Sequence, residues 1–275
     1  MFYKKASLVI SIYKNVEALK AVLDSLKFQS VKPYEIVISE DGEDKIVKDF
    51  LNNYEYDGQM QHLTQTDDGW GKNKALNRAI KSAKTDYLIF IDGDCVLHPR
   101  FVESHLNFAK PQVVLGGKRI KLDQYSSEKL LKGELNPDQM NKYVISSYSE
   151  IKKAQSKFIE EGIFIDPKGW FGFIPKIRSM HQLKGCNMSF SKQAAFAING
   201  FDEDYIKPAI GEDIDLTWRF KRAGYQLKSL RNLAVQYHLY HKENWTDQSE
   251  NIKIMEGRKA LNQYVCINGL EKNRR

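Results

Sequence analysis

The sequence has little cysteine: its 275 residues include three, Cys95, Cys186 and Cys266, and these lie far apart. An odd number at this spacing excludes a disulfide framework and fits no zinc-finger pattern. Free thiols of this kind are typical of the reducing cytoplasm. No apolar run approaches the roughly 20 residues of a membrane-spanning helix, and the amino end lacks the apolar stretch of a signal peptide. We therefore expect a cytoplasmic protein.

Charge of one sign is not gathered in blocks either, apart from the terminal EKNRR, although the net charge is +7. Zinc-finger, helix-turn-helix and RNA-binding aromatic signatures are missing, so nucleic acid is not the expected partner. Spread basic residues suit phosphate-bearing substrates or the anionic inner face of a membrane. Peripheral association with the cytoplasmic face of the membrane stays open, because scattered lysines are also typical of an ordinary solvated surface.

The first third of the chain alternates between two apolar patterns. Period-2 or continuous apolar runs predict strands, and apolar residues at helical spacing predict helices. The expected strands are 6–13, 34–42, 60–65 and 86–94, and the expected helices are 16–29, 44–54 and 72–83. This alternation predicts an α/β fold with a Rossmann-like, mostly parallel central sheet flanked by helices.

Beyond residue 100 the pattern is less regular. The expected helices are 101–109, 192–199, 211–224 and 246–264, and the expected strands are 112–122 and 233–241. Residues 123–162 are polar and favour helix, and 168–192 form an aromatic and basic segment. Since the chain has no repeat and no low-complexity linker, we expect one domain.

Polar side chains gather where the first strands end. Ser11 and Tyr13 end the first strand, Asp41 the second, and Asp92 and Asp94 the fourth. Ligands of parallel α/β sheets bind beyond the carboxyl ends of the strands. The Asp-Gly-Asp run offers the oxygen ligands that Mg²⁺ and Mn²⁺ prefer. The alternative is an ordinary acidic turn after a strand.

A second acidic group stands in GEDIDLTWRF, where Glu212, Asp213 and Asp215 open an expected helix. Negative charge at a helix start is favoured by the helix dipole, which is the simpler explanation. The glycine and aromatic residues before it, NGFDEDYIKPAI, favour a pocket instead. A carboxylate there would serve as general base toward a hydroxyl.

Two further segments carry candidate ligands. His238 and His241 in VQYHLYH offer ring nitrogens to a metal, but positions i and i+3 of a strand face opposite sides, so we expect one to point inward. Lys72 and Lys74 follow a Gly-Trp-Gly loop at a helix start, where phosphate binds readily. A surface histidine and a solvated helix face are the respective alternatives.

In order along the chain, these segments resemble the inverting family 2 glycosyltransferases of the GT-A fold, over roughly residues 5–245. The matching stretches are SLVISIYKN, IVISEDGED, KNKALNRAIKSAKTDYLIFIDGD, GCNMSFSKQAAFAINGFDEDY and GEDIDLTWRFKRAG, followed by the histidine segment. The later stretches are similar to bacterial galactosyltransferase and chondroitin-polymerase domains. Two departures are Glu40 in place of an aspartate, and KPAIGED where an aromatic GW often stands.

The resemblance implies a GT-A fold with a smaller antiparallel portion on the acceptor side. It implies a single domain, 1–275, with a nucleotide-binding half at 1–95 and a metal and acceptor half at 96–245. A C-terminal helix and basic tail would occupy 246–275.

The resemblance also implies roles for residues. Ser11, Tyr13 and Asp41 would hold the nucleotide base, with Asp41 favouring uracil. Asp92, of the DxD motif, would lie near the ribose and metal. The implied metal ligands are Asp92, Asp94 and one histidine, His241 being preferred to His238. Asp213 would be the catalytic base and Glu212 would contact the acceptor. The donor would be held by Gly185, Cys186 and Asn187, and its base or diphosphate by Lys72 or Lys74.

The implied reaction moves a hexose or N-acetylhexosamine from a nucleotide-sugar, with UDP favoured, to a hydroxyl of a saccharide or lipid-linked saccharide. It needs Mn²⁺ or Mg²⁺ and belongs to bacterial surface polysaccharide or lipid-linked glycan synthesis. A nucleotidyltransferase is the first alternative, although the amino end lacks a glycine-rich phosphate loop. A non-catalytic saccharide- or nucleotide-sugar-binding module is the second. Trp170 and Phe171 are either acceptor-binding or core residues.

Overall fold

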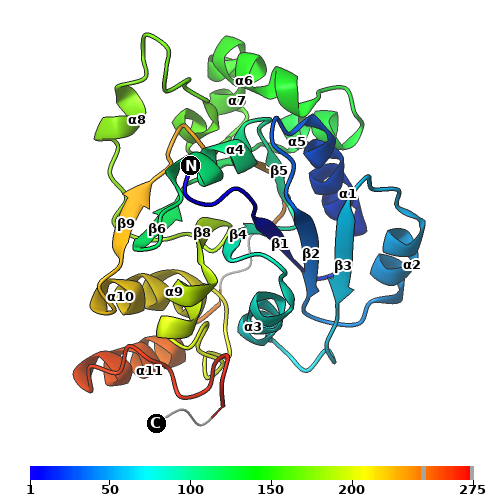
Figure 1. Ribbon diagram of the computed structural model, residues 1–275. Coiled ribbons are helices and arrows are strands. Elements are labelled where there is room, and N and C mark those ends of the chain that lie inside the picture. Colours follow the sequence, from blue (N-terminus) through cyan, green and yellow to red (C-terminus); the bar gives the residue numbers. More distant parts are fainter. Residues whose placement is uncertain (243–245, 273–275) are drawn as a thin grey trace.

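A seven-stranded sheet forms the centre of the molecule (Figure 1). The computed structural model describes residues 1–242 and 246–272. In sheet order the strands are β3 (Gln59–Leu63), β2 (Glu35–Glu40), β1 (Ser7–Ile12), β4 (Tyr87–Asp92), β8 (Asn187–Ser191), β6 (Val113–Gly116) and β9 (Gln226–Ser229). All pairs are parallel except those of β8, which is antiparallel to β4 and β6. The α/β fold with a mostly parallel central sheet, expected from the sequence, is confirmed.

Helices cover both faces of this sheet, as the near-continuous apolar strands require. Alternate residues of β1 separate the faces: Leu8 and Ile10 pack with α1 (Val16–Ser25), α2 (Lys45–Asn53) and α4 (Phe101–Phe108). Val9 packs on the other side with α3 (Lys72–Ser82), α9 (Lys192–Ala197) and α10 (Asp215–Arg222), which lie below the sheet in Figure 1.

A second, three-stranded sheet lies beside the first. Its order is β5 (Cys95–Leu97), β10 (Gln236–His238) and β7 (Ile120–Lys121), with β10 antiparallel to β5 and parallel to β7. A separate apolar cluster joins it to helices of the polar region. These are α5 (Gln124–Leu131), α6 (Pro137–Ser146) and α7 (Tyr148–Lys153). The remaining helices of the described chain are α8 (Ile174–Ile177) and α11 (Ser249–Ala260), with short turns at Leu26–Phe28, Ile159–Gly162 and Ile210–Ile214.

The expected strand 112–122 is wrong as one element, because the chain leaves β6 at Gly116 and enters the other sheet at β7. Gly117 permits this crossing: a Cβ there would lie 2.4 Å from the Asn187 side chain. The expected strand 233–241 is likewise reduced to β10. The expected helix 246–264 is shorter, as α11, and the end of the basic tail at 273–275 lies outside the described residues.

Candidate active site

Two cavities lie beyond the carboxyl ends of the central strands, and Asp92 lines both. The first, of about 460 Å³, is lined by Ser11, Ile12, Tyr13, Lys14, Asn15, Asp41, Asp67, Gly69, Trp70, Lys72, Asp92, Gly93 and Asp94. The second, of about 330 Å³, is lined by Asp92, Lys118, Arg119, Lys121, Phe158, Lys184, Gly185, Cys186, Glu212 and Asp213. The strand-end residues expected to converge therefore do share one region.

Asp92, the last residue of β4, is held between two cations. Its Oδ1 lies 2.9 Å from Lys72 Nζ, and its Oδ2 lies 2.9 Å from Arg119 Nη1. Lys72 is the first residue of α3, and its Nζ is also 2.6 Å from Glu212 Oε2. Burial acts to raise the pKa of Asp92, but Lys72 and Arg119 outweigh it and the pKa falls below its usual value. Asp92 is therefore ionised and oriented before any ligand arrives.

Gly93 lets the chain turn so that both aspartates face the first cavity. Its N–H donates to the Ser11 carbonyl at 2.8 Å. A Cβ at this position would lie 2.4 Å from Ile12 Cγ2 and 3.2 Å from the Ser11 oxygen. The close approach of this turn to β1 therefore requires glycine.

Asp94 and both histidines form a donor set. Asp94 Oδ2 lies 3.3 Å from His238 Nε2 and 3.5 Å from His241 Nε2, and the two ring nitrogens are 3.3 Å apart. We expected only one of the two histidines to face the site, and this is wrong, because both lie beside Asp94. Strand β10 ends at His238, and the chain that follows turns His241 back toward Asp94. Burial would raise the pKa of Asp94, yet the hydrogen bonds from His238 and His241 hold it well below its usual value.

This donor set fits a divalent transition metal. The three ligand atoms lie within 4.8 Å of one another, and His238 is 4% exposed with its Nε2 directed at the carboxylate. Imidazole nitrogen and carboxylate oxygen together suit Mn²⁺, whereas Mg²⁺ prefers oxygen alone.

Asp41 lies deep in the first cavity and fixes the loop before α3. It is 7% exposed, and its oxygens accept from Gln65 Nε2 at 2.6 Å and from the Gly71 N–H at 2.8 Å. Tyr13, at the opposite wall, is half exposed and donates to Asp67 at 3.2 Å. The Asp41 side of the cavity is thus buried and held by two hydrogen bonds, whereas Tyr13 forms an exposed part of its wall.

Lys74 lines neither main cavity. It is exposed and lines a smaller hollow of about 170 Å³, which shares Asp41, Gly69 and Trp70 with the first cavity. Of the two lysines expected near the diphosphate, the geometry therefore favours Lys72.

Asp213 and Glu212 lie in a π-helical turn, Ile210–Ile214, that precedes α10. The expected helix 211–224 is thus present as this π-helical turn followed directly by α10, and both carboxylates lie in its first turn. Asp213 Oδ1 accepts from the Gly185 N–H at 2.6 Å and Oδ2 from Lys184 Nζ at 3.1 Å. Burial, together with Asp92 and Asp213, raises the pKa of Glu212 against the opposing effect of Lys72.

The segment Gly185–Asn187 divides in two. Gly185 and Cys186 line the second cavity, but Asn187 is fully buried. Its side-chain amide donates to the carbonyls of Lys118 and Ala234, and its oxygen lies 3.2 Å from His105 Nε2. Every polar atom of the Asn187 side chain therefore has a protein partner, whereas the contact of this segment with the donor stays a prediction carried by Gly185 and Cys186.

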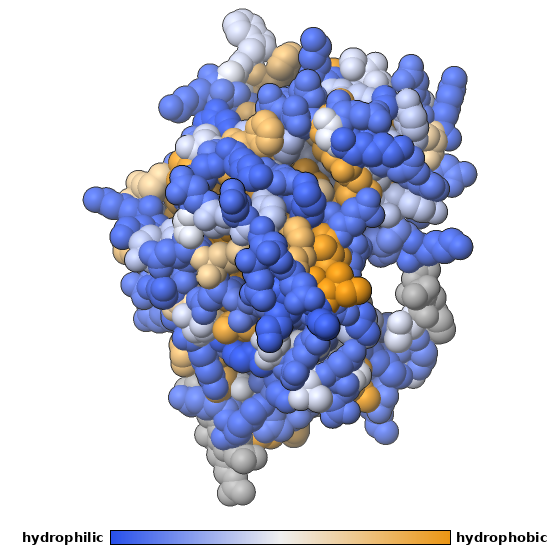
Figure 2. All heavy atoms as spheres, turned by 90° about the vertical axis from the view of Figure 1, so that its right-hand side faces the viewer, coloured by the Kyte–Doolittle hydropathy of each residue, from blue (hydrophilic) through white to orange (hydrophobic). Residues whose placement is uncertain are grey.

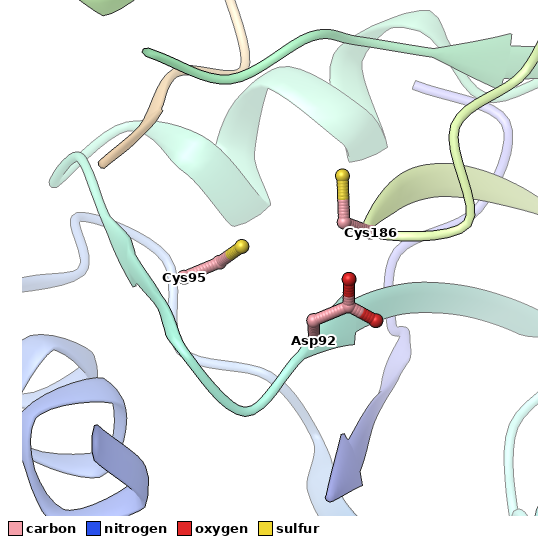
Figure 3. Close-up of side chains that lie close together, drawn as sticks. All are labelled: Asp92, Cys95 and Cys186. Atoms are coloured by element: carbon pink, nitrogen blue, oxygen red, sulfur yellow. The ribbon is translucent and has the colours of Figure 1, made fainter. Parts of the chain in front are cut away.

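Figure 3 shows Asp92 at the end of β4, Cys95 on β5 and Cys186 ahead of β8 around one common space. Their ligand atoms lie within 4.8 Å of one another. Arg119 Nη1 lies 3.7 Å from Cys95 Sγ as well as beside Asp92, so a cation already fills this corner. Burial raises the pKa of the Cys95 thiol, which is therefore protonated and unreactive.

The basic residues that line the second cavity, among them Arg119 and Lys184, were missed in the sequence analysis. Arg119 stands between β6 and β7, in GGKRIK, where a glycine pair and basic residues after an apolar run were the available signal. Lys184 stands directly before Gly185 of the GCN stretch, and no sequence pattern distinguished it from the other lysines.

Comparisons with known proteins agree with this geometry. The model of glycosyl transferase family 2 matches residues 7–171, and that described as the N-terminal domain of galactosyltransferase matches 176–242. The chain is 25% identical to a chondroitin synthase of Escherichia coli, over 90% of this chain and 37% of that protein. It is 23% identical to the amylovoran biosynthesis glycosyltransferase AmsB of Erwinia amylovora, over 90% of this chain and 74% of that protein.

Solved structures share the fold. One is S. aureus TarS 1-349 in complex with UDP-GlcNAc, with a TM-score of 0.59 and 14% identity over 98% of this chain and 68% of that one. Another is the mannosyltransferase PcManGT from Pyrobaculum calidifontis in complex with GDP-Man and Mn²⁺, with a TM-score of 0.57 and 14% identity over 94% and 62%. The chain spans less than half the length of several curated relatives, including the chondroitin synthase.

Proposed function

This chain belongs to glycosyl transferase family 2 and is a transferase enzyme, and from that premise we propose that it moves a hexose or N-acetylhexosamine from a nucleotide-sugar to a saccharide hydroxyl with inversion. The observation that carries the proposal is the shared wall of the two cavities, where Asp92 separates a nucleotide-sized pocket from one lined by Asp213. The family match favours this reaction over a nucleotidyltransferase and over a non-catalytic binding module.

In the proposed complex the nucleotide occupies the first cavity. Its base lies between Tyr13 and Asp41, with Ser11 below, and the carboxylate of Asp41 favours the imide N–H of uracil. A UDP-sugar is therefore the favoured donor. The diphosphate lies toward Lys72 and Arg119, whose cationic groups already flank Asp92.

Asp94, His238 and His241 would hold Mn²⁺ or Mg²⁺, with Asp92 beside it. When bound, the metal supplies positive charge that stabilises the departing diphosphate. The donor-set chemistry favours Mn²⁺, because two of the three ligands are imidazoles.

Asp213 is the proposed general base. Its carboxylate lines the second cavity, and the Gly185 N–H fixes the direction of one oxygen at 2.6 Å. It removes the proton of the acceptor hydroxyl as that oxygen attacks the anomeric carbon opposite the leaving diphosphate. Glu212 is less suited to this step, because its partner Lys72, at 2.6 Å, is largely buried, whereas Lys184, the partner of Asp213, is exposed; Glu212 is proposed to contact the acceptor.

The domain division belongs to the same proposal: one domain, with residues 1–95 serving the nucleotide and 96–245 the metal and acceptor. The acceptor is a saccharide or lipid-linked saccharide, as in surface polysaccharide synthesis, and the enzyme works at the cytoplasmic face of the membrane. The free thiols Cys95, Cys186 and Cys266 support a reducing compartment. Within the described residues, no helix has the length and apolar character to cross a membrane.

The first experiment is a thermal-shift panel of UDP, GDP, dTDP and CMP, with and without Mn²⁺. We expect Mn²⁺-dependent stabilisation by UDP above the others, at least tenfold weaker binding in Asp94→Ala, and unchanged binding in Asp57→Ala. Asp57 is an exposed aspartate outside both cavities. Stabilisation by no nucleotide, or equal stabilisation of both variants, contradicts the proposed donor site.

A further inference from the structure

The segment 168–177, here called the aromatic protrusion, exposes apolar side chains that a globular protein normally buries. Trp170 is 92% exposed, Ile177 74%, Phe171 61% and Phe173 56%. Single exposed apolar residues are ordinary, but four within one short segment mark an interaction surface. None of these side chains lines either cavity of the candidate active site.

Hydrogen-bonded turns hold the aromatic protrusion in this form. The N–H of Gly172 donates to the Gly169 carbonyl at 2.9 Å, and the N–H of Ile174 to the Phe171 carbonyl at 3.0 Å. Gly172 and Pro175 are buried beneath the exposed side chains, and a Cβ on Gly172 would lie 2.3 Å from the Pro167 oxygen. These turns and the close packing of Gly172 therefore fix the backbone in a form that leaves the aromatic rings exposed.

The charge around these rings is positive. Lys168 and Lys176 are exposed within the protrusion. The neighbouring carboxylate of Asp166 lies 3.4 Å from Arg100, and the Glu161 carboxylate lies 3.0 Å from Arg178 at the end of the segment. Glu160, half exposed, also lies 3.9 Å from Arg178, so each of these three carboxylates has an arginine beside it and the two lysines keep their charge toward solvent.

This chemistry suits a lipid surface better than a saccharide. Sugar sites combine an aromatic face with amide or carboxylate side chains that fix orientation, and 167–177 contains no Asp, Glu, Asn or Gln. Tryptophan, phenylalanine and isoleucine flanked by lysines are typical of segments that enter the headgroup region of anionic membranes.

The protrusion lies apart from the hydrophilic face of the molecule. In Figure 1, α8 stands at the upper left edge, above the edge strand β9. Figure 2 shows the side that carries α2 and β3, which is largely hydrophilic with small separate apolar areas. Exposed apolar residues on that side, such as Ile46 of α2 at 69%, provide a control position.

We propose that the aromatic protrusion docks this protein on an anionic phospholipid surface, with Trp170, Phe171 and Ile177 in the headgroup region and the two lysines at the lipid phosphates. The inference deepens the proposed membrane association by naming its surface. The chain leads from the protrusion into Lys184 and Gly185, which line the second cavity. Docking would therefore set the acceptor side of the enzyme close to the membrane.

The test is flotation of the full chain with phosphatidylcholine vesicles, with and without 30 mol% phosphatidylglycerol — a composition that we take as roughly that of an anionic bacterial surface. We expect binding to the anionic vesicles, at least a tenfold lower partition coefficient in the double variant Trp170→Ser/Phe171→Ser, and no change in Ile46→Ser. Lys168→Glu/Lys176→Glu should abolish the preference for anionic lipid. Each variant is accepted only if its Tm matches the parent.

A second readout locates the contact. Brominated lipid should quench the fluorescence of the parent on binding, and Trp170→Phe should still float while losing much of that quenching. No flotation of the parent, or equal flotation of the double variant, overturns the proposal. So does a soluble dimer that Trp170→Ser dissociates, or binding of a free oligosaccharide that this change abolishes.

Transfer to a water-soluble acceptor is measured in parallel. It should be unchanged in the double variant, because the protrusion is outside both cavities. Loss of transfer there with retained flotation would assign the rings to the acceptor and contradict the docking role. Absence of transfer in the parent, with normal flotation, would count against the proposed function alone.

Discussion

At the scale of single residues, the candidate site is ordered before any substrate enters. Each oxygen of Asp92 has its own cation, Lys72 or Arg119, and each oxygen of Asp213 has its own N–H donor. Orientation of this kind lowers the cost of aligning reacting groups. The two carboxylates differ in role because Asp92 faces both cavities whereas Asp213 faces the second.

Replacing Asp213 by asparagine should reduce kcat by about 10²–10⁴-fold, since a positioned general base contributes that much. The size of the side chain is retained, so KM for the donor should change little. Steady-state kinetics with a saccharide acceptor measure both constants.

Asp215→Asn is the matched control for that variant. Asp215 is fully buried and ion-paired with Arg219 at 3.4 Å, away from both cavities. It should lower Tm while leaving kcat within a few-fold. A kcat for Asp213→Asn within tenfold of the parent would remove Asp213 from the role of base.

Two buried histidines make the stability fall in acid. Burial lowers the pKa of His98 to about 4 and that of His105 to about 3, from 6.5 when unfolded. Below pH 6.5 the unfolded chain binds protons that the folded chain does not, so the free energy of unfolding decreases as pH falls toward 4. Each histidine should remove on the order of 2 kcal/mol between pH 7 and 5.

His98→Phe tests this, because the ring stacks on Phe164 at 4.3 Å and a phenyl group keeps that contact. Urea unfolding at pH 7, 6 and 5 should show a shallower loss of stability in the variant than in the parent. His181→Phe, at an exposed position, should keep the parental slope. An unchanged slope in His98→Phe would contradict the assignment.

At the scale of elements, α10 is connected to the loop that bears Gly185. The hydroxyl of Thr217 donates to the Asp213 carbonyl at 2.7 Å and accepts from the Leu183 N–H at 2.8 Å. Thr217 is thus a positioning residue, since it ties the base-bearing turn to the wall of the second cavity.

Thr217→Val keeps the shape and removes both hydrogen bonds. We expect kcat to fall by roughly tenfold, consistent with a small displacement of the base, while Mn²⁺-dependent UDP binding stays unchanged. Thr217→Ser should restore kcat, because the hydroxyl returns. If valine and serine variants behave alike, the hydroxyl has no positioning role.

Elements of the first third and the helices of the last third could be predicted from the sequence, whereas the two strands 112–122 and 233–241 could not. The strands 6–13, 34–42 and 86–94 are continuous apolar runs, and β1, β2 and β4 lie inside them. Their ends meet because parallel strands share an edge. Segments 112–122 and 233–241 are equally apolar, but each changes partner or leaves its sheet midway, which tertiary packing decides and local pattern does not.

The same limit applies to the site. The aspartates at the strand ends and in the acidic turn could be recognised in the sequence, because carboxylates next to buried apolar segments need a partner or a metal. Arg119 and the turn of His241 toward Asp94 depend on how separate segments meet in space.

At the scale of the whole molecule, Arg219 links distant parts of the chain. Its side chain is 1% exposed and donates to the carbonyls of Ile198, Gly200 and Tyr264. It therefore joins α10, the turn after α9 and the segment that follows α11.

Arg219→Leu should lower the free energy of unfolding by about 3–5 kcal/mol, because it leaves the Asp215 carboxylate buried without its partner. The double variant Arg219→Leu/Asp215→Leu should recover part of that loss. Chemical unfolding of the three proteins measures the difference. A single variant as stable as the parent would show that this buried pair does not hold the C-terminal segment in place.

The burial of Cys95, Cys186 and Cys266, at 0%, 5% and 1% exposure, has a practical consequence. A bulky maleimide dye meets no accessible native thiol on the folded chain. One cysteine introduced at the exposed position of Ile177 or Ile46 would therefore carry a single label, without deletion of the native three. A paramagnetic or fluorescent reporter at either position would then measure the distance of that position from a lipid surface, on a protein that is otherwise unmodified.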